Sequence, residues 1–196
     1  MCGIAGIYNL IGETISDGES RIWQMTNSMI HRGPDYQNVH ISANGNLALG
    51  YTRLAITDPD DRTSQPLQTL DKKSVLAFNG EIYDYLTRRG ELEKENIHFR
   101  TRMDTEVLLE GLNLKGDEFL KKIDGIWALA YYDMSEDRLL LSRDLLGERH
   151  LYYWINEKEI IFASEVKPIL VAAGKHSFEI KLESVLSALY FYTCAP

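Results

Sequence analysis

The second residue of the chain is a cysteine, and this position gives it chemistry that a cysteine in mid-chain lacks. If Met1 is removed, Cys2 carries a free α-amine beside its own thiol. An unperturbed α-amino group has a pKa of about 7.7 to 8.0 and an unperturbed thiol about 8.5, so near neutral pH the amine can accept the thiol proton. The sequence therefore predicts a nucleophile that needs no histidine as its base.

Acyl transfer by a thiolate also needs donors for the developing oxyanion. The stretch "FNGEIYDY" places Asn79 and Gly80 at the expected end of a strand, where a side-chain amide and an unhindered backbone N–H can point toward one oxygen. Taken alone, the same dipeptide is also typical of an ordinary Asn-Gly turn. The residues themselves leave both interpretations open.

Two charged residues suggest a site for a free amino acid. Arg53 lies among small and apolar residues in "GYTRLAI", where a guanidinium needs an anionic partner to offset its desolvation. Asp104 precedes an apolar, periodic stretch and is equally well explained as a helix cap. Together they could hold the carboxylate and the ammonium of one ligand, each charge-assisted bond contributing about 1.5 to 3 kcal/mol.

Metal and disulfide chemistry receive little support from the sequence. The histidines are scattered singly, with no i,i+4 pair, and no metal site is expected; they are His31, His40, His98, His150 and His176. The cysteines are Cys2 and Cys194 only, too few for a disulfide framework. A bridge between them is not expected in the cytoplasmic location that the absence of a secretory signal favours.

Composition narrows the class of protein. The chain has 196 residues, of which 44% are hydrophobic and 26% charged, as in ordinary globular proteins. Its formal charge of −8 would repel phosphate backbones and anionic lipid, so neither nucleic acid nor a membrane is expected as a partner. The longest apolar run, 126–132, is far shorter than the roughly 20 residues of a membrane-spanning helix.

Hydrophobic periodicity and turn residues divide the chain into strands and helices. The expected strands cover residues 3–10, 36–42, 47–54 and 74–78, followed by a succession of four at 125–133, 138–144, 150–156 and 159–165. The expected helices cover residues 19–30, 81–95, 104–114 and 117–123, and a surface loop covers 57–66. Four strands in succession predict an antiparallel sheet, and the whole pattern favours a layered α+β fold.

Several motifs, in this order, resemble a known family. They are "MCGIAGIY", "HRGPD", "RLAITD", "QPL", "FNGEIYDY", "DTEVLL", "DGIWALAYYD", "RDLLGERHLYY" and "FASEVKPIL". The chain resembles the glutaminase domain of class II glutamine amidotransferases, most closely the asparagine synthetase branch, from Met1 to about Leu170. The resemblance implies the fold of N-terminal nucleophile hydrolases, a four-layer αββα sandwich of two antiparallel sheets between helices.

The resemblance also implies a role for each matching residue. Cys2 becomes the nucleophile after removal of Met1, and it attacks the side-chain amide of L-glutamine, releases ammonia and forms a thioester that is hydrolysed to glutamate. Asn79 and Gly80 form the oxyanion hole. The glutamine site is completed by Arg53 for the α-carboxylate, by Glu81 and Asp104 on the α-amino side, and by the pocket-lining residues Leu54, Ile56 and Thr57.

Members of this branch continue into an ATP-dependent synthetase domain. The resemblance therefore implies a glutaminase domain over residues 1–175 and an apolar segment, 176–196, leading toward that second domain. No cofactor is expected in the glutaminase domain, whereas ATP and Mg are expected in the synthetase domain. A homodimer of the full-length enzyme is a further implication, and the acceptor of the ammonia, aspartate or another carboxylate, stays open.

Some positions depart from the family pattern, and two other readings stay open. Met103 stands where a smaller residue is usual, and Leu145 and residues 148–150 differ from the typical segment, which we expect to affect packing more than chemistry.

The chain could instead be a binding or regulatory module that has the fold without turnover. It could also belong with the amidotransferases of amino sugar or purine synthesis, whose downstream domains differ.

Overall fold

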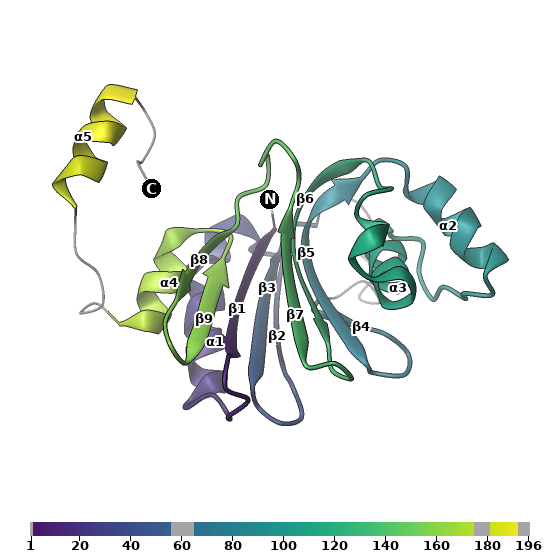
Figure 1. Cartoon of the computed structure of the whole chain (residues 1–196), viewed down its shortest axis with the longest axis horizontal. Coiled ribbons are helices and arrows are strands. Elements are labelled where there is room, and N and C mark those ends of the chain that lie inside the picture. Colours follow the sequence, from purple (N-terminus) through teal and green to yellow (C-terminus); the bar gives the residue numbers. More distant parts are fainter. Residues whose placement is uncertain (1, 56–64, 175–180, 192–196) are drawn as a thin grey trace.

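The computed structural model describes residues 2–55, 65–174 and 181–191. Ile56, Thr57 and Cys194, which the sequence analysis singled out, lie outside the described residues. The described chain forms two antiparallel sheets, which lie face to face in Figure 1.

The first sheet has five strands in the order β2-β3-β1-β9-β8. Its strands are β1 (Gly3–Asn9), β2 (Tyr36–Ile41), β3 (Leu47–Arg53), β8 (Tyr152–Ile155) and β9 (Glu159–Ala163). The N-terminal strand β1 lies at its centre, between β3 and β9, which is why nearly all its residues are buried. A chain terminus would fray at an edge, whereas here it is tied on both sides.

The second sheet has four strands in the order β4-β5-β6-β7. They are β4 (Leu67–Gln68), β5 (Ser74–Ile82), β6 (Gly125–Asp133) and β7 (Arg138–Arg143). The prediction that the last four strands form one sheet is therefore wrong: β6 and β7 belong here, whereas β8 and β9 join the first sheet. Alternating hydrophobicity marks a strand but does not encode its partner, and the eight residues between β7 and β8 are long enough for the chain to cross between sheets.

Helices cover the outer faces of both sheets. On the first sheet lie α1 (Gly18–Ser28), a 3₁₀-helix (Ile30–Arg32) and α4 (Val166–Ala173), and on the second lie α2 (Tyr85–Lys94), α3 (Asp104–Lys115) and a 3₁₀-helix (Gly116–Phe119). The last helix, α5 (Leu182–Phe191), stands apart from these layers in Figure 1. None of the helices in the described part of the chain combines the length and the apolar character that crossing a membrane requires.

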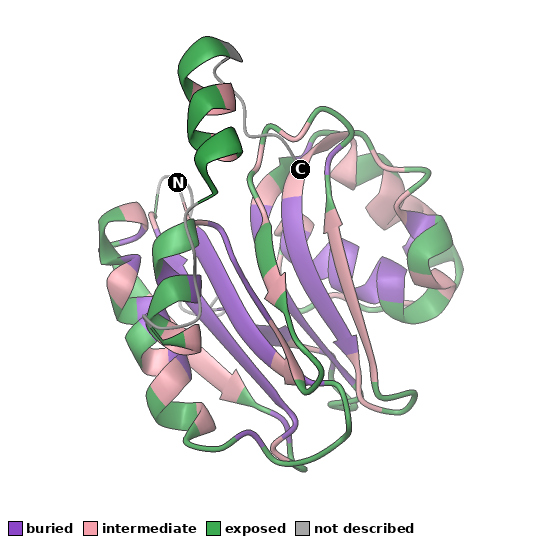
Figure 2. Cartoon of the chain, turned by 60° about the vertical axis from the view of Figure 1, so that its left-hand side comes forward, coloured by how far each residue is buried: buried purple, intermediate pink, exposed green. Residues whose placement is uncertain are grey.

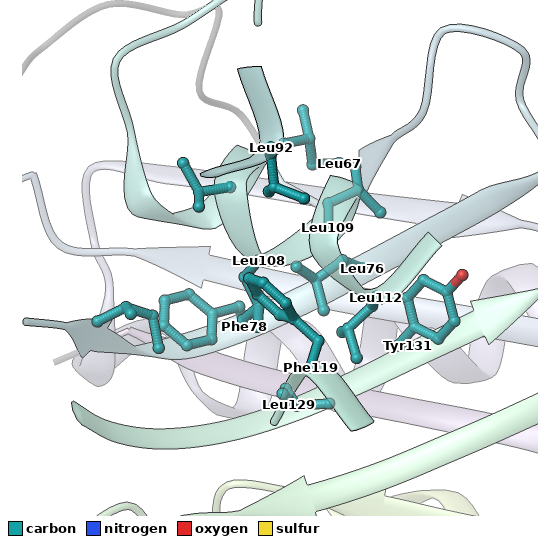
Figure 3. Packing of buried hydrophobic residues seen from close by; sticks show 12 residues of the cluster. Leu67, Leu76, Phe78, Leu92, Leu108, Leu109, Leu112, Phe119, Leu129 and Tyr131 are labelled. Atoms are coloured by element: carbon teal, nitrogen blue, oxygen red, sulfur yellow. The ribbon is translucent and has the colours of Figure 1, made fainter. Parts of the chain in front are cut away.

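Three apolar clusters fill the spaces between the four layers. One lies between the sheets and includes Ile4, Leu49 and Phe162. A second packs the first sheet against α1 and α4. The third packs α2 and α3 onto the second sheet; Figure 3 shows how Leu108, Leu112 and Phe119 meet the strand residues there. This αββα layering confirms the α+β sandwich, and Figure 2 shows the central strands as the most buried part of the chain.

Three local predictions need correction. The strand expected over 74–78 does not stop at Asn79 and Gly80 but runs to Ile82, because it pairs with β6 without interruption from Ser74 to Ile82. The long ladder overrides the turn preference of Asn-Gly, and the helix expected from Glu81 consequently begins only at Tyr85. The helix expected over 117–123 is a 3₁₀ turn that ends at the buried Phe119.

Candidate active site

The amino-terminal end of β1, the ends of β3 and β5, and the start of α3 surround a pocket of about 600 Å³. Seven of the site residues predicted from the sequence line it: Cys2, Arg53, Leu54, Asn79, Gly80, Glu81 and Asp104. Ile56 and Thr57 lie outside the described residues, so their predicted place in the pocket stays a prediction. The fold thus gathers a thiol, an amide and charges of both signs into one cavity.

Cys2 stands immediately before the first residue of β1 and is half-buried. Gly3 pairs with Thr52 and Ile4 pairs with Tyr51, so strand alternation places Cys2, Ile4 and Tyr51 on the face that packs against the second sheet. Tyr51 lines the pocket beside Cys2. Its pKa is raised well above the ordinary value, first by burial and then by the adjacent Cys2, so the hydroxyl stays protonated at neutral pH.

Asn79 is buried within β5, and its side-chain nitrogen Nδ2 makes no hydrogen bond within the part of the chain that the structure describes. A buried donor without a partner costs free energy, typically about 1 to 3 kcal/mol, and is therefore rare unless a ligand or water satisfies it. At the neighbouring Gly80 a Cβ atom would lie 2.2 Å from the carbonyl oxygen of Ile126. Only glycine fits there, and the pocket therefore keeps an open backbone next to the Asn79 amide.

The "HRGPD" segment, expected to end a helix, packs against the end of β3. A Cβ at Gly33 would lie 2.4 Å from the backbone nitrogen of Arg53, so the two backbones can approach only because residue 33 is glycine. Asp35 donates its N–H to the Arg53 carbonyl at 3.1 Å, and its Oδ2 accepts the N–H of Ala55 at 2.7 Å. These contacts fix the backbone that carries the buried Arg53 side chain into the pocket.

Asp104 is the first residue of α3, and its carboxylate joins that helix to β5. Its Oδ2 accepts the N–H of Ile82 at 3.0 Å, and its Oδ1 accepts the N–H of Thr105 at 2.7 Å. The predicted cap position is therefore wrong by one residue, since Met103 is the N-cap and also lines the pocket. Burial raises the pKa of Asp104, the charge of Glu81 adds to this, and the hydrogen bonds from the Ile82 N–H and from the N–H and hydroxyl of Thr105 oppose it.

Arg149 also lines the pocket, although the sequence analysis assigned its segment to packing. Asp144 shapes this segment: its carboxylate accepts the N–H of Glu148 at 2.9 Å and that of Arg149 at 3.0 Å. No sequence signal marks this contact, because it depends on how the loop after β7 folds over the sheet. Tyr51, in contrast, could have been found, since it stands two residues before Arg53 on the same strand and thus on the same face.

Nothing in the described residues favours a resident metal ion. Within residues 2–55, 65–174 and 181–191, no group of three or more histidine, cysteine, aspartate or glutamate side chains is placed to hold one. The pocket instead combines a thiol nucleophile, an unsatisfied amide donor and charged side chains for a polar ligand. This combination suits cleavage of an acyl bond in a small zwitterionic substrate.

Comparison with known proteins identifies the family. A family model described as "Glutamine amidotransferase domain" matches residues 1–196. The chain belongs to this family. Among curated relatives of this glutamine amidotransferase domain, asparagine synthetase [glutamine-hydrolyzing] 1 of Bacillus subtilis is 34% identical over 197 residues, which cover 97% of the chain, and asparagine synthetase B of Escherichia coli is 36% identical over 171 residues, 87% of the chain.

The amidotransferase domain spans only 30% of the length of each of these two relatives. Its fold is also found in a solved structure of glutamine phosphoribosylpyrophosphate amidotransferase from Bacillus subtilis, with a TM-score of 0.73 and 20% sequence identity, over 88% of this chain and 44% of that one. The expected sandwich of the N-terminal nucleophile hydrolase type is thereby confirmed, as is the resemblance on which it was based.

Proposed function

We propose that this amidotransferase domain hydrolyses L-glutamine to glutamate and ammonia through a thioester on Cys2. The observation that carries the proposal is the presence of Cys2, Asn79 and Gly80 in one pocket with Arg53 and Asp104. The first three supply a nucleophile and oxyanion donors, and the last two supply charges opposite to those of an amino acid's carboxylate and ammonium. Family membership supports the same reaction.

In the proposed cycle, the free α-amine of Cys2 takes the thiol proton, and the thiolate attacks the side-chain amide carbon. The C–S bond forms, and the oxygen becomes an oxyanion that the Asn79 amide and the Gly80 N–H stabilise. The proton passes from the α-amine to the leaving nitrogen, the C–N bond breaks, and ammonia leaves. Water then hydrolyses the thioester, which releases glutamate and regenerates the thiol.

Arg53 binds the α-carboxylate of glutamine in this proposal, and Asp104 binds its α-ammonium, with Glu81 at the exposed rim on the same side. Leu54 lines the pocket, and Ile56 and Thr57 are proposed to continue this wall. The half-buried Arg149 adds a cation to the wall. In this proposal the α-carboxylate and the α-ammonium of glutamine are bound, and its side-chain amide lies next to Cys2.

The ammonia is proposed to serve an ATP-dependent amidation, as in asparagine synthesis, by a domain outside this sequence. The names of the curated relatives and the 30% of their length that the chain spans support this assignment. ATP and Mg belong to that domain, and none of the proposed steps in the glutaminase pocket requires a cofactor. We propose that the glutaminase domain ends near residue 175 and that the enzyme is cytoplasmic. A homodimer of the full-length enzyme is a further proposal.

The test is glutamate release from glutamine by chain whose loss of Met1 has been verified by mass spectrometry. We expect activity in the processed wild type and none in Cys2→Ala, because the variant has no nucleophile. Chain that retains Met1 is expected to be inactive, since the nitrogen of Cys2 is then an amide and cannot take the proton. Activity in Cys2→Ala would refute the proposed nucleophile.

An electrophilic glutamine analogue distinguishes an enzyme from a binding module. The processed wild type is expected to form a covalent adduct at Cys2, and Cys2→Ala none. Adduct formation without turnover would indicate a competent site that needs its partner domain. If no adduct forms although Met1 is gone, the domain binds without catalysis and the proposal is wrong.

A further inference from the structure

The backbone of Cys2, the proposed nucleophile, is not held by the sheet. Cys2 lies outside the β ladder, which begins with the pair Gly3 and Thr52. After removal of Met1, the chain holds Cys2 from one side only, and terminal residues fray unless other contacts tie them down. Since the α-amine and the thiol both belong to this residue, its backbone must be held for the amine, the thiol and Asn79 to keep one arrangement.

One side chain provides that contact. The Nε of Arg32 donates to the carbonyl oxygen of Cys2 at 3.0 Å, from the 3₁₀-helix that follows α1. A guanidinium is planar with its donors in a fixed fork, so the direction of Nε depends on what the other nitrogens bind. The orientation of Arg32 therefore decides whether this hydrogen bond forms.

Glu165 sets that orientation. Its Oε1 accepts the Nη1 of Arg32 at 3.0 Å, and the Arg32 side chain is 13% exposed. His31 contacts the same carboxylate at 3.0 Å from the solvent side. Burial opposes ionisation of Glu165, but the hydrogen bonds from Arg32 and His31 outweigh it and lower the pKa, so the carboxylate is charged at neutral pH.

The preceding residue holds the same strand. Ser164 accepts the N–H of Ile4 with its Oγ at 3.0 Å and donates its own N–H to the Ile4 carbonyl at 2.9 Å. The junction between β9 and α4, residues 164–165, therefore holds the start of the chain by hydrogen bonds at two points. Ser164 bonds Ile4 directly, and Glu165 is linked to Cys2 through Arg32. The ion pair between Arg32 and Glu165 is therefore linked to Cys2, whereas an ordinary ion pair on the surface would not be.

We propose that Glu165 is a positioning residue for catalysis: it orients Arg32 so that Nε anchors the Cys2 carbonyl, which holds the α-amine and the thiol in place beside Asn79. This inference rests on the proposed use of Cys2 as the nucleophile. Loss of Glu165 should leave the glutamine-binding charges intact while it misplaces the attacking group. Misplacement by about 1 Å can lower a rate by as much as 10²-fold.

The chain offers a matched control for the experiment. Glu159, the first residue of β9, also pairs with an arginine of the helical layer that covers the first sheet, Arg21, through bonds of 2.9 and 2.7 Å. This pair is similarly buried, with side chains 21% and 17% exposed, but Arg21 makes its further hydrogen bond to the carbonyl of Ala172 at 3.2 Å and not to Cys2. The variants Glu165→Ala and Glu159→Ala therefore remove equivalent ion pairs, of which only one touches the nucleophile.

The test is to measure glutamate release by the processed wild type and by both variants across glutamine concentrations. For Glu165→Ala we expect kcat to fall by about 10- to 100-fold with KM within about 2-fold, and for Glu159→Ala both constants to stay within about 2-fold. In Glu165→Gln an amide oxygen can still accept from Arg32, so part of the rate should return. Unchanged kcat in Glu165→Ala, or equal losses in both alanine variants, would overturn the inference.

Two further measurements keep the test decisive. If Glu165→Ala does not fold, Arg32→Lys replaces it, because one ammonium cannot reproduce the fork that joins Glu165 to Cys2; we expect the same kcat loss, and an unchanged kcat would overturn the inference. Alkylation of Cys2 by iodoacetamide is expected in all variants, which shows that the thiol is still present and reactive. A processed wild type that neither releases glutamate nor forms the covalent adduct with the glutamine analogue would instead refute the proposed function itself.

Discussion

Asn79 is the residue whose surroundings carry the most direct chemical implication. Its buried Nδ2 makes no hydrogen bond within the described chain, and this donor lies in the same pocket as the Cys2 thiol. Folding has placed an amide there at a cost to stability. A group kept in spite of that cost is well suited to stabilise charge that develops only during the reaction.

We therefore expect Asn79→Ala to separate activity from stability. The rate of glutamate release should fall by about 10²- to 10³-fold, the usual effect of losing an oxyanion donor. The melting temperature should be unchanged or higher, because the substitution removes an unsatisfied buried group. The control is Asn113→Ala, an exposed position in α3 outside the pocket, which should keep full activity; an equal loss there would contradict the assignment.

Asp104 predicts a pH dependence of glutamine use. Only its carboxylate form can hold the substrate's ammonium, and burial raises the pKa of Asp104 above the ordinary value of about 3.9. If Asp104 binds the substrate as proposed, kcat/KM should decline as pH falls, with a midpoint above the ordinary pKa of an aspartate. Because the charge of Glu81 also raises this pKa, Glu81→Gln should move the midpoint to lower pH; a midpoint that moves upward would count against the interpretation.

At the scale of elements, the start of α3 is organised by a buried carboxylate. The side chain of Glu106 is 1% exposed and accepts four hydrogen bonds, two from Arg100 at 3.0 and 2.9 Å and two from Thr101 at 2.7 and 2.8 Å. These bonds fold the segment before α3 back onto the helix. They thereby set the direction from which Asp104 enters the pocket.

Glu106→Gln should destabilise the fold by about 1 to 3 kcal/mol at neutral pH, since an amide cannot accept all four bonds. Burial would raise the pKa of Glu106, but the hydrogen bonds from Arg100 and Thr101 outweigh it and lower the pKa. The stabilisation is therefore present above the unfolded pKa of about 4.3 and disappears as pH falls through the lower folded pKa. The difference in the free energy of unfolding between Glu106→Gln and wild type should therefore become smaller as pH falls.

Urea unfolding at neutral and acidic pH measures this difference. The control is Glu118→Gln, which removes an exposed ion pair with Lys121 and should leave the free energy of unfolding nearly unchanged, because solvent screens exposed charges. The difference in the free energy of unfolding could instead stay the same down to the lowest pH at which the protein is folded. Packing of the Glu106 side chain, and not its charge, would then hold the segment before α3.

At the scale of the whole molecule, the three apolar clusters belong to the layers formed by β1 through α4. The described side chains of α5, residues 182–190, are exposed or half-buried, and none is fully buried (Figure 2). The core of the sandwich thus draws on the part of the chain that ends near residue 175. This distribution supports the domain boundary proposed there.

A chain shortened to residues 1–175 is therefore expected to fold and to melt within about 2 °C of the full chain, since less than about 0.5 kcal/mol of burial is removed. The comparison is Ile169→Ala in α4, a buried residue whose truncation should cost about 2 to 5 kcal/mol. Thermal unfolding by circular dichroism measures both. A shortened chain that melts as low as Ile169→Ala would place α5 within the domain.

Much of the local structure was predictable from neighbouring residues. The central strand β1, the strands β2 and β3, and the helix α3 all lie close to where alternation and periodicity place them. The exception at the end of β5 has a long-range cause. At Asn79 and Gly80 the local turn preference competes with pairing to β6 over the whole length of β5, and the long-range ladder prevails.

From the residues alone we could infer the proposed nucleophile, a cysteine next to Met1, together with the family motifs and the elements that carry them. The folded chain was needed to show which strands share a sheet, that Arg149 lines the pocket, and that Glu165 is linked to Cys2 through Arg32. The physical reason is that periodicity and turn preference act over a few neighbouring residues, whereas these contacts join segments far apart in the chain and exist only once both sheets have assembled.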